Sequence, residues 1–162
     1  MNNEQLAVIL NSGSGSANAS EKVTLIKTAF SSFNVEPKIF LSSGGDLVQK
    51  TQSILEEGYK TIIACGGDGT VSAVAGTLLG TDVTLGVLPL GTLNHFAKDL
   101  KIPPTLPEAA QVIKEGYTIS VDLGKVNGKT FINNSSIGIY QKIVRHRENL
   151  QKKGVSKWIA FS

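Results

Sequence analysis

The chain of 162 residues has a single cysteine, Cys65, so it can form neither an internal disulfide nor a cysteine-based zinc site. Every apolar run is shorter than the ~20 residues that a membrane-spanning helix needs. Residues 1–5 lack the basic start of a secretory signal peptide, and no apolar core follows them. These absences argue against a disulfide-stapled scaffold and predict a cytoplasmic protein without a transmembrane segment.

Positive charge is concentrated in one stretch of the chain. The net charge is +3, but positions 142–157 hold six basic residues against Glu148 alone, a net of +5, which leaves −2 for the rest. The basic residues are Lys142, Arg145, Arg147, Lys152, Lys153 and Lys157. This excess suits an anionic partner such as a nucleotide or an acidic lipid surface, and a solvated helix face explains it equally well. Nucleic acid is not an expected partner, because the stretch lacks interleaved aromatic residues and any recognised motif.

Short apolar runs alternate with amphipathic segments over the first two thirds of the chain. The expected strands are 6–10, 38–41, 61–64 and 83–88, and the expected helices are 20–33, 47–57, 71–79 and 105–115. Strands that alternate with helices predict an α/β fold, here a Rossmann-like parallel sheet with helices on both faces. We assign residues 1–117 to this nucleotide-binding domain.

The pattern changes after Tyr117. Residues 119–123 alternate with period two, and Asn127-Gly128 is typical of a type I′ hairpin turn, with a returning strand at 130–137. A basic helix is expected over 138–153. We therefore assign residues 118–162 to the start of an antiparallel, β-rich second domain, whose exposed hairpin could support a homodimer.

The stretch Gly66-Gly67-Asp68-Gly69-Thr70 organises the chain. It joins an apolar strand to a helix, and its glycines would let a ligand approach the backbone closely. Amide groups at the start of the helix point outward, where the helix dipole favours anions. The stretch therefore predicts a phosphate cradle, although an ordinary strand-to-helix turn uses the same residue types.

The loops after the other expected strands are also polar or rich in glycine. They are residues 11–16, 42–46 and 89–96. Ligands of open α/β sheets bind beyond the carboxyl ends of the strands, so we expect these loops to lie around one site.

Two of these loops carry a family resemblance. Residues 66–70, followed one strand later by Leu88-Pro89-Leu90-Gly91-Thr92-Leu93-Asn94, resemble the catalytic domain of diacylglycerol kinases, which bacterial lipid kinases and sphingosine kinases share. Residues 11–15 resemble the first nucleotide loop of that family, and residues 121–124 and 131–133 resemble its entry into the second domain. The resemblance covers nearly the whole chain, and the pair of glycine-rich loops makes it specific.

The resemblance implies an ATP-dependent lipid kinase that moves the γ-phosphate to a lipid hydroxyl, with ATP and Mg²⁺ as cofactors. Gly66, Gly67 and Gly69 would let the backbone approach the phosphates. Thr70 would add its hydroxyl and cap the helix. Asp68 would be the catalytic residue, acting through Mg²⁺, which we favour, or by orienting the reacting hydroxyl. The further expected nucleotide contacts are Asn11, Ser42, Gly91, Thr92 and Asn94.

The resemblance also implies a lipid substrate met at the inner membrane face by peripheral contact. Because members of this family are longer, we expect this chain to lack their C-terminal half. Two other classes of function stay open. One is a small-molecule kinase of the NAD kinase type, which uses a similar glycine turn, and the other is a non-catalytic module that binds a nucleotide or an anionic lipid.

The sequence departs from the family pattern at a few positions. Ser12 replaces a proline, and His95 stands where aspartate is commonest. Residues 139–141 lie where many relatives carry an acidic residue near the acceptor lipid, which leaves the identity of the acceptor open. The roles of His95, Arg145 and Arg147 are open as well.

Overall fold

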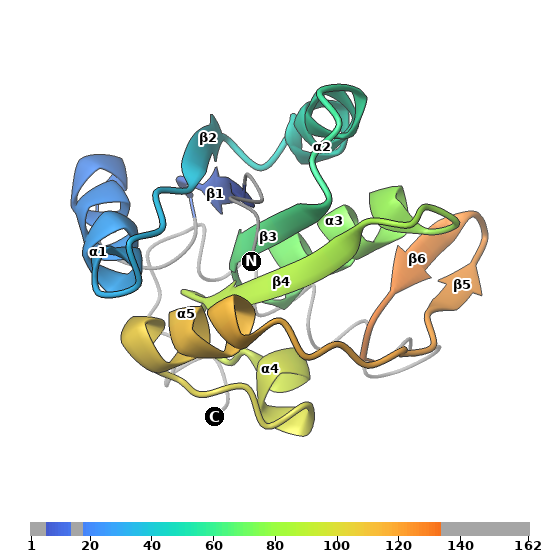
Figure 1. Ribbon diagram of the computed structural model, residues 1–162. Coiled ribbons are helices and arrows are strands. Elements are labelled where there is room, and N and C mark those ends of the chain that lie inside the picture. The colour runs from blue at the N-terminus through green and yellow to red at the C-terminus, as the bar shows by residue number, and fades with distance from the viewer. Residues whose placement is uncertain (1–5, 14–17, 134–162) are drawn as a thin grey trace, which may run out of the picture.

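The computed structural model describes residues 6–13 and 18–133, in which strands and helices alternate (Figure 1). The elements are β1 (Leu6–Asn11), α1 (Ala19–Ser31), β2 (Lys38–Ser42), α2 (Leu47–Glu56), β3 (Thr61–Gly66), α3 (Asp68–Leu78), β4 (Thr84–Pro89), α4 (His95–Asp99), α5 (Leu106–Glu115), β5 (Gly124–Val126) and β6 (Lys129–Phe131). The expected alternation is confirmed, with boundaries that shift by a few residues.

Strands β1 to β4 form one parallel sheet in the order β2-β1-β3-β4. The register places Asn11 beside Ser42, Leu10 beside Cys65, and Gly66 beside Pro89. The carboxyl ends of all four strands therefore lie along one edge. The chain moves from β1 to β2 on one side and returns to β3 on the other, which makes β1/β3 the switch point where ligands of such sheets bind.

Helices cover both faces of the sheet, so the predicted fold class is confirmed. Helices α2, α3 and α4 pack on one face, and α1 and α5 pack on the other. Strand β1 serves both layers, because Ala7 and Ile9 face the first group while Val8 and Leu10 face the second, all without exposed surface. Burial on both faces explains why the central strands β1 and β3 are nearly continuous apolar runs.

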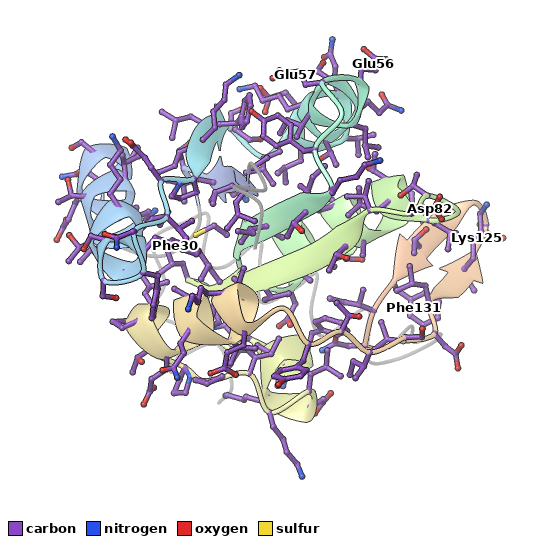
Figure 2. The ribbon with its side chains drawn as sticks, viewed as in Figure 1. Phe30, Glu56, Glu57, Asp82, Lys125 and Phe131 are labelled. Atoms are coloured by element: carbon purple, nitrogen blue, oxygen red, sulfur yellow. The ribbon has the colours of Figure 1, made fainter. Side chains whose placement is uncertain are left out.

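The second layer is centred on α1 and α5. Figure 2 shows the Phe30 side chain reaching from α1 toward the sheet, whereas Glu56 and Glu57 at the end of α2 point outward. Phe30 has no exposed surface and belongs to the same cluster as Ala109 and Ala110 of α5. The small alanines let α5 approach both the sheet and α1 closely.

Strands β5 and β6 form a separate antiparallel hairpin with the predicted turn. Asn127 and Gly128 both have positive φ, 48° and 77°, as a type I′ turn requires. The hairpin rests on α3, where the Ser72 hydroxyl donates to the Thr130 carbonyl at 3.1 Å. A side chain at Gly76 would lie 3.0 Å from Thr130 Cβ, so a glycine there permits the close packing.

The predicted strand over 119–123 is wrong. Residues 117–123 contain no helix or strand, and β5 begins only at Gly124. Ile119 and Val121 are 73% and 41% exposed, so the alternation of apolar residues there finds no strand partner and no covering layer among the residues that the structure describes. β6 begins at Lys129 and ends at Phe131, and the rest of the predicted strand over 130–137 has no match in the part described.

The expected helix over 138–153, the basic stretch and residues 139–141 lie outside the described residues. The boundary between the two predicted domains stays a prediction. Within residues 6–13 and 18–133, no helix is long and apolar enough to cross a membrane.

The buried thiol of Cys65 supplies a test of this packing. Burial raises the pKa of Cys65 to about 12, against a smaller opposing effect of the Lys22 charge. At pH 8 we expect Ellman's reagent to react at least about a hundredfold more slowly with the folded chain than with the urea-unfolded chain, because the thiolate is the reactive form. Since the unfolded thiol ionises first, stability should fall as the pH rises from about 8.5 toward 12. Equal reaction rates would contradict the buried position.

Candidate functional site

A side-chain hydrogen bond joins the end of β1 to the first turn of α3 at the switch point. Asn11 Nδ2 donates to Thr70 Oγ1 at 3.0 Å, and Asn11 Oδ1 accepts from the Gly13 amide at 3.1 Å. A Cβ atom at Gly66 would lie 2.5 Å from Thr70 Oγ1, so the threonine occupies the space that a side chain at Gly66 would need. Three of the predicted site residues, Asn11, Gly66 and Thr70, are thus brought together.

Thr70 does not cap its helix, which corrects the expectation from the sequence. Helix α3 begins at Asp68, earlier than predicted, and its N-cap is Gly67 in an extended conformation without a side-chain cap. Thr70 then lies within the first turn, only 3% exposed, with its hydroxyl accepting from Asn11. The first amides of α3 have no acceptor within the helix, and a Cβ at Gly69 would have nothing within 4 Å. This helix start can therefore receive an anion.

The loops after β1 and β2 are tied together by main-chain and side-chain bonds. Ser12 donates to the Ser42 carbonyl twice, through its amide at 2.8 Å and its hydroxyl at 2.9 Å. Ser42 is 1% exposed. Its hydroxyl donates to Asp46 Oδ1 at 2.6 Å and accepts from the Gly44 amide at 3.2 Å. A proline at position 12 could make neither of the first two bonds. Ser42 thus orders this loop, and its contact with a nucleotide stays a prediction.

Asp46 is held ionised by the groups around it. Hydrogen bonds from Lys50 and Ser42 hold the pKa of Asp46 well below its usual range. A lowered pKa stabilises the fold above the ordinary carboxyl pKa of about 4, and this contribution is lost as the pH falls further.

The loop after β4 is folded around Asn94. This residue is left-handed, with φ 49° and ψ 49°. Its Oδ1 accepts from the Gly91 amide at 3.0 Å, and its Nδ2 donates to the carbonyls of Gly91 and Pro89 at 2.9 and 3.2 Å. The side chain is therefore engaged within its own loop, whereas Thr92 is exposed. The predicted nucleotide contacts of Asn94 and Thr92 stay predictions.

The two glycine-rich loops touch through their backbones. A Cβ at Gly91 would lie 2.3 Å from Gly67 Cα, so no side chain fits between them. The Leu90 amide donates to the Gly66 carbonyl at 3.2 Å. The structure therefore places Gly91 directly against the turn that contains Gly67.

Asp68 adds a second link between these loops. Its Oδ2 accepts from the His95 amide at 3.0 Å, and its Oδ1 accepts from the Phe96 amide at 2.9 Å. The contribution of His95 to this contact is its main chain.

Lys22 is a feature of the site region that the sequence analysis missed. The residue is 2% exposed, and its Nζ donates to the Ser12 carbonyl, one residue after β1, at 3.1 Å. The spacing could have indicated this burial, because Lys22 lies four residues before Ile26 and therefore on the apolar face of α1. Buried charges are kept only where they have partners, and the Ser12 carbonyl is one partner of the Lys22 ammonium.

Among the residues that the structure describes, no group of three His, Cys, Asp or Glu side chains could hold a metal ion. Asp68 is the carboxylate that the structure brings to the junction of the two glycine loops. Mg²⁺ in kinases is commonly held by one or two carboxylates together with the phosphates of the nucleotide, and a single carboxylate suits that arrangement.

An open parallel sheet with glycine-rich turns gathered at its switch point is typical of α/β domains that bind phosphate-bearing ligands. The family model of the diacylglycerol kinase catalytic domain matches residues 5–126. The chain belongs to this family, and the resemblance seen in its motifs is confirmed.

Individual relatives agree with this assignment. The diacylglycerol kinase of Staphylococcus carnosus is 37% identical over 91 residues, which are 55% of this chain and 30% of that protein. A YegS-like lipid kinase of Klebsiella pneumoniae is 40% identical over 102 residues, 61% of this chain and 34% of that protein. The crystal structure of a diacylglycerol kinase from Bacillus anthracis superposes with a TM-score of 0.68 at 30% identity, covering 80% of this chain and 48% of that one. This chain thus spans about a third of the length of these two curated relatives.

The contact between the glycine loops can be tested with a matched pair of alanine substitutions. Gly91→Ala should lower the free energy of unfolding by about 1–3 kcal/mol, because its methyl group would overlap the backbone at Gly67. Gly69→Ala should leave stability unchanged or raise it by up to about 1 kcal/mol, because alanine is the better helix former and the space is open. Urea unfolding monitored by circular dichroism measures both. Equal stabilities of the two variants would show that the loops do not touch as described.

Proposed function

We propose that this chain is the nucleotide-binding part of an ATP-dependent lipid kinase, which transfers the γ-phosphate of ATP to a lipid hydroxyl. The observation that supports it best is the meeting of the loops at the strand ends. The Asn11–Thr70 bond at the switch point and the neighbouring contact of Gly67 with Gly91 gather the glycine-rich loops of a diacylglycerol kinase family member. In phosphoryl transfer the protein mainly positions the reacting groups and neutralises charge, which is what such loops can do.

In this proposal the start of α3 receives the phosphates. The open space beside Gly69 lets an oxygen approach the first amides of the helix, and Gly66 and Gly67 keep side chains out of the way. The other proposed nucleotide contacts surround this point at the strand ends. They are Asn11, Ser42, Thr70, Gly91, Thr92 and Asn94.

Asp68 is the proposed catalytic residue, linked to the phosphates through Mg²⁺. When bound, Mg²⁺ would neutralise charge on the phosphate oxygens. Each carboxylate oxygen of Asp68 already accepts one amide and retains a second lone pair, so the group can still hold a water or an ion.

We also propose a cytoplasmic location and a lipid acceptor, which the protein meets by peripheral contact with the inner face of the membrane. The relatives named as diacylglycerol and lipid kinases support this class of acceptor. An association into a homodimer through the β5–β6 hairpin remains part of the proposal, since this hairpin leaves Val126 46% exposed.

Calorimetric titration with Mg-ATP tests the nucleotide site on the 162-residue chain. We expect saturable binding that Gly69→Ala weakens by about tenfold or more, because its methyl group would displace a phosphate oxygen from the amides of the helix start. The stability of this variant, measured as above, serves as the control for folding. A folded wild-type chain that does not bind Mg-ATP would overturn the proposal for this chain.

Transfer of labelled phosphate from ATP tests the acceptor. Diacylglycerol in mixed micelles and NAD in solution would be offered separately, with Mg²⁺, to a chain extended to the length of the relatives. We expect label in the lipid and none in NAD. Label in NAD would replace the lipid kinase by a small-molecule kinase, and nucleotide binding without transfer to either acceptor by that extended chain would indicate a binding module.

A further inference from the structure

Asp68 binds two main-chain amides that lie 27 and 28 residues further along the chain, at the start of α4. Its two carboxylate oxygens accept from consecutive amides, those of His95 and Phe96, at 3.0 and 2.9 Å. Asp68 is the first residue of α3, and its carboxylate accepts hydrogen bonds from the first two amides of α4. One carboxylate therefore lies at the start of both helices. Carboxylates are favoured at both positions, because the amides of a first helical turn lack acceptors within the helix.

The start of α4 depends on Asp68 because its own N-cap residue is occupied elsewhere. The N-cap is Asn94, which is left-handed and makes no side-chain cap. Its side chain instead bonds to the main chain of Gly91 and Pro89. The capping function of position 94 is therefore supplied from the neighbouring turn by Asp68.

The consequence of the bond is the position of the second glycine loop. Gly91 makes backbone contact with Gly67, a contact that has no side chain to lock it. The Leu90 amide and the Asp68 carboxylate are the groups that tie the loop to the β3–α3 turn from its two ends. Loss of the carboxylate would release one end of the loop while the sheet register holds the other.

We infer that Asp68 is a positioning residue, which clamps the β4–α4 loop against the β3–α3 turn and so sets nucleotide affinity by a route that needs no Mg²⁺. The inference deepens the proposed function and rests on it for the nucleotide. This positioning role adds to the metal-linked role of Asp68, and experiments with and without Mg²⁺ distinguish the two roles. A purely metal-linked aspartate would affect nucleotide binding only when Mg²⁺ is present.

Amide hydrogen exchange, followed by NMR, tests the clamp directly. In Asp68→Asn one oxygen becomes an NH₂ group that cannot accept, so at least one of the two amides loses its partner. We expect exchange at His95 or Phe96 to become about tenfold faster or more, with the amides of β1 and β3 unchanged. Asp99→Asn is the matched control, because it removes an exposed carboxylate from the other end of α4. Unchanged exchange at both amides in Asp68→Asn would overturn the inference.

Titration with ADP tests the consequence for affinity. Wild-type chain, Asp68→Asn and Asp99→Asn would each be titrated once with Mg²⁺ and once with EDTA. The clamp predicts that Asp68→Asn weakens ADP binding about tenfold or more in both conditions, while Asp99→Asn matches the wild type. A loss that is confined to the Mg²⁺ titration would show that Asp68 acts through the metal and not through the loop.

If Asp68→Asn does not fold, the wild-type chain still allows a decision, because scalar couplings across the hydrogen bonds report whether the His95 and Phe96 amides donate to the Asp68 carboxylate. Absence of both couplings would overturn the clamp. If the wild-type chain binds no nucleotide, the proposed function fails for this chain, and the exchange rates still show whether Asp68 holds the loop.

Discussion

The approach of Gly67 to Gly91 is the constraint around which the strand ends are arranged. These residues meet main chain to main chain, and a single methyl group on Gly91 would overlap the Gly67 Cα. The contact requires that β3 and β4 be neighbours with Gly66 beside Pro89, and that each strand turn sharply at its end. Glycine allows the close approach, but it contributes little to the stability of the contact between the two loops. Hydrogen bonds from one loop to the other stabilise this contact.

The crossing bonds form a continuous set along the edge of the sheet. Ser12 reaches the Ser42 carbonyl, Asn11 reaches Thr70, and Asp68 reaches the amides at the start of α4. Each loop after a strand is thereby linked to a neighbour, so the edge behaves as one unit. The proposed phosphate site would depend on these links, since amides select a phosphate only when they are held in position. The replacement of the usual proline at position 12 by serine fits here, because it adds two bonds to the set.

Several features could be predicted from sequence because they depend on neighbouring residues. The four parallel strands follow from short runs that are mostly apolar, and the hairpin follows from the conformational freedom of Asn127-Gly128. The family assignment follows from the spacing of two glycine-rich loops. The strand expected over 119–123 failed for the opposite reason. An alternating pattern indicates a strand only where a partner strand and a covering layer exist, and the described part of the fold offers neither to Ile119.

The sequence by itself determined the parallel α/β architecture, the two glycine loops and the residues eligible for the site, because backbone freedom and apolar periodicity are local properties. Only the tertiary structure decided what those residues do to one another. It made Thr70 an acceptor for Asn11 in place of a helix cap, bonded the Asn94 side chain to its own loop, and buried Lys22 against the Ser12 carbonyl. It also brought Asp68 to the start of α4. These partners lie up to 59 positions apart, and they meet because the β2-β1-β3-β4 order aligns the strand ends, an arrangement that no local pattern encodes.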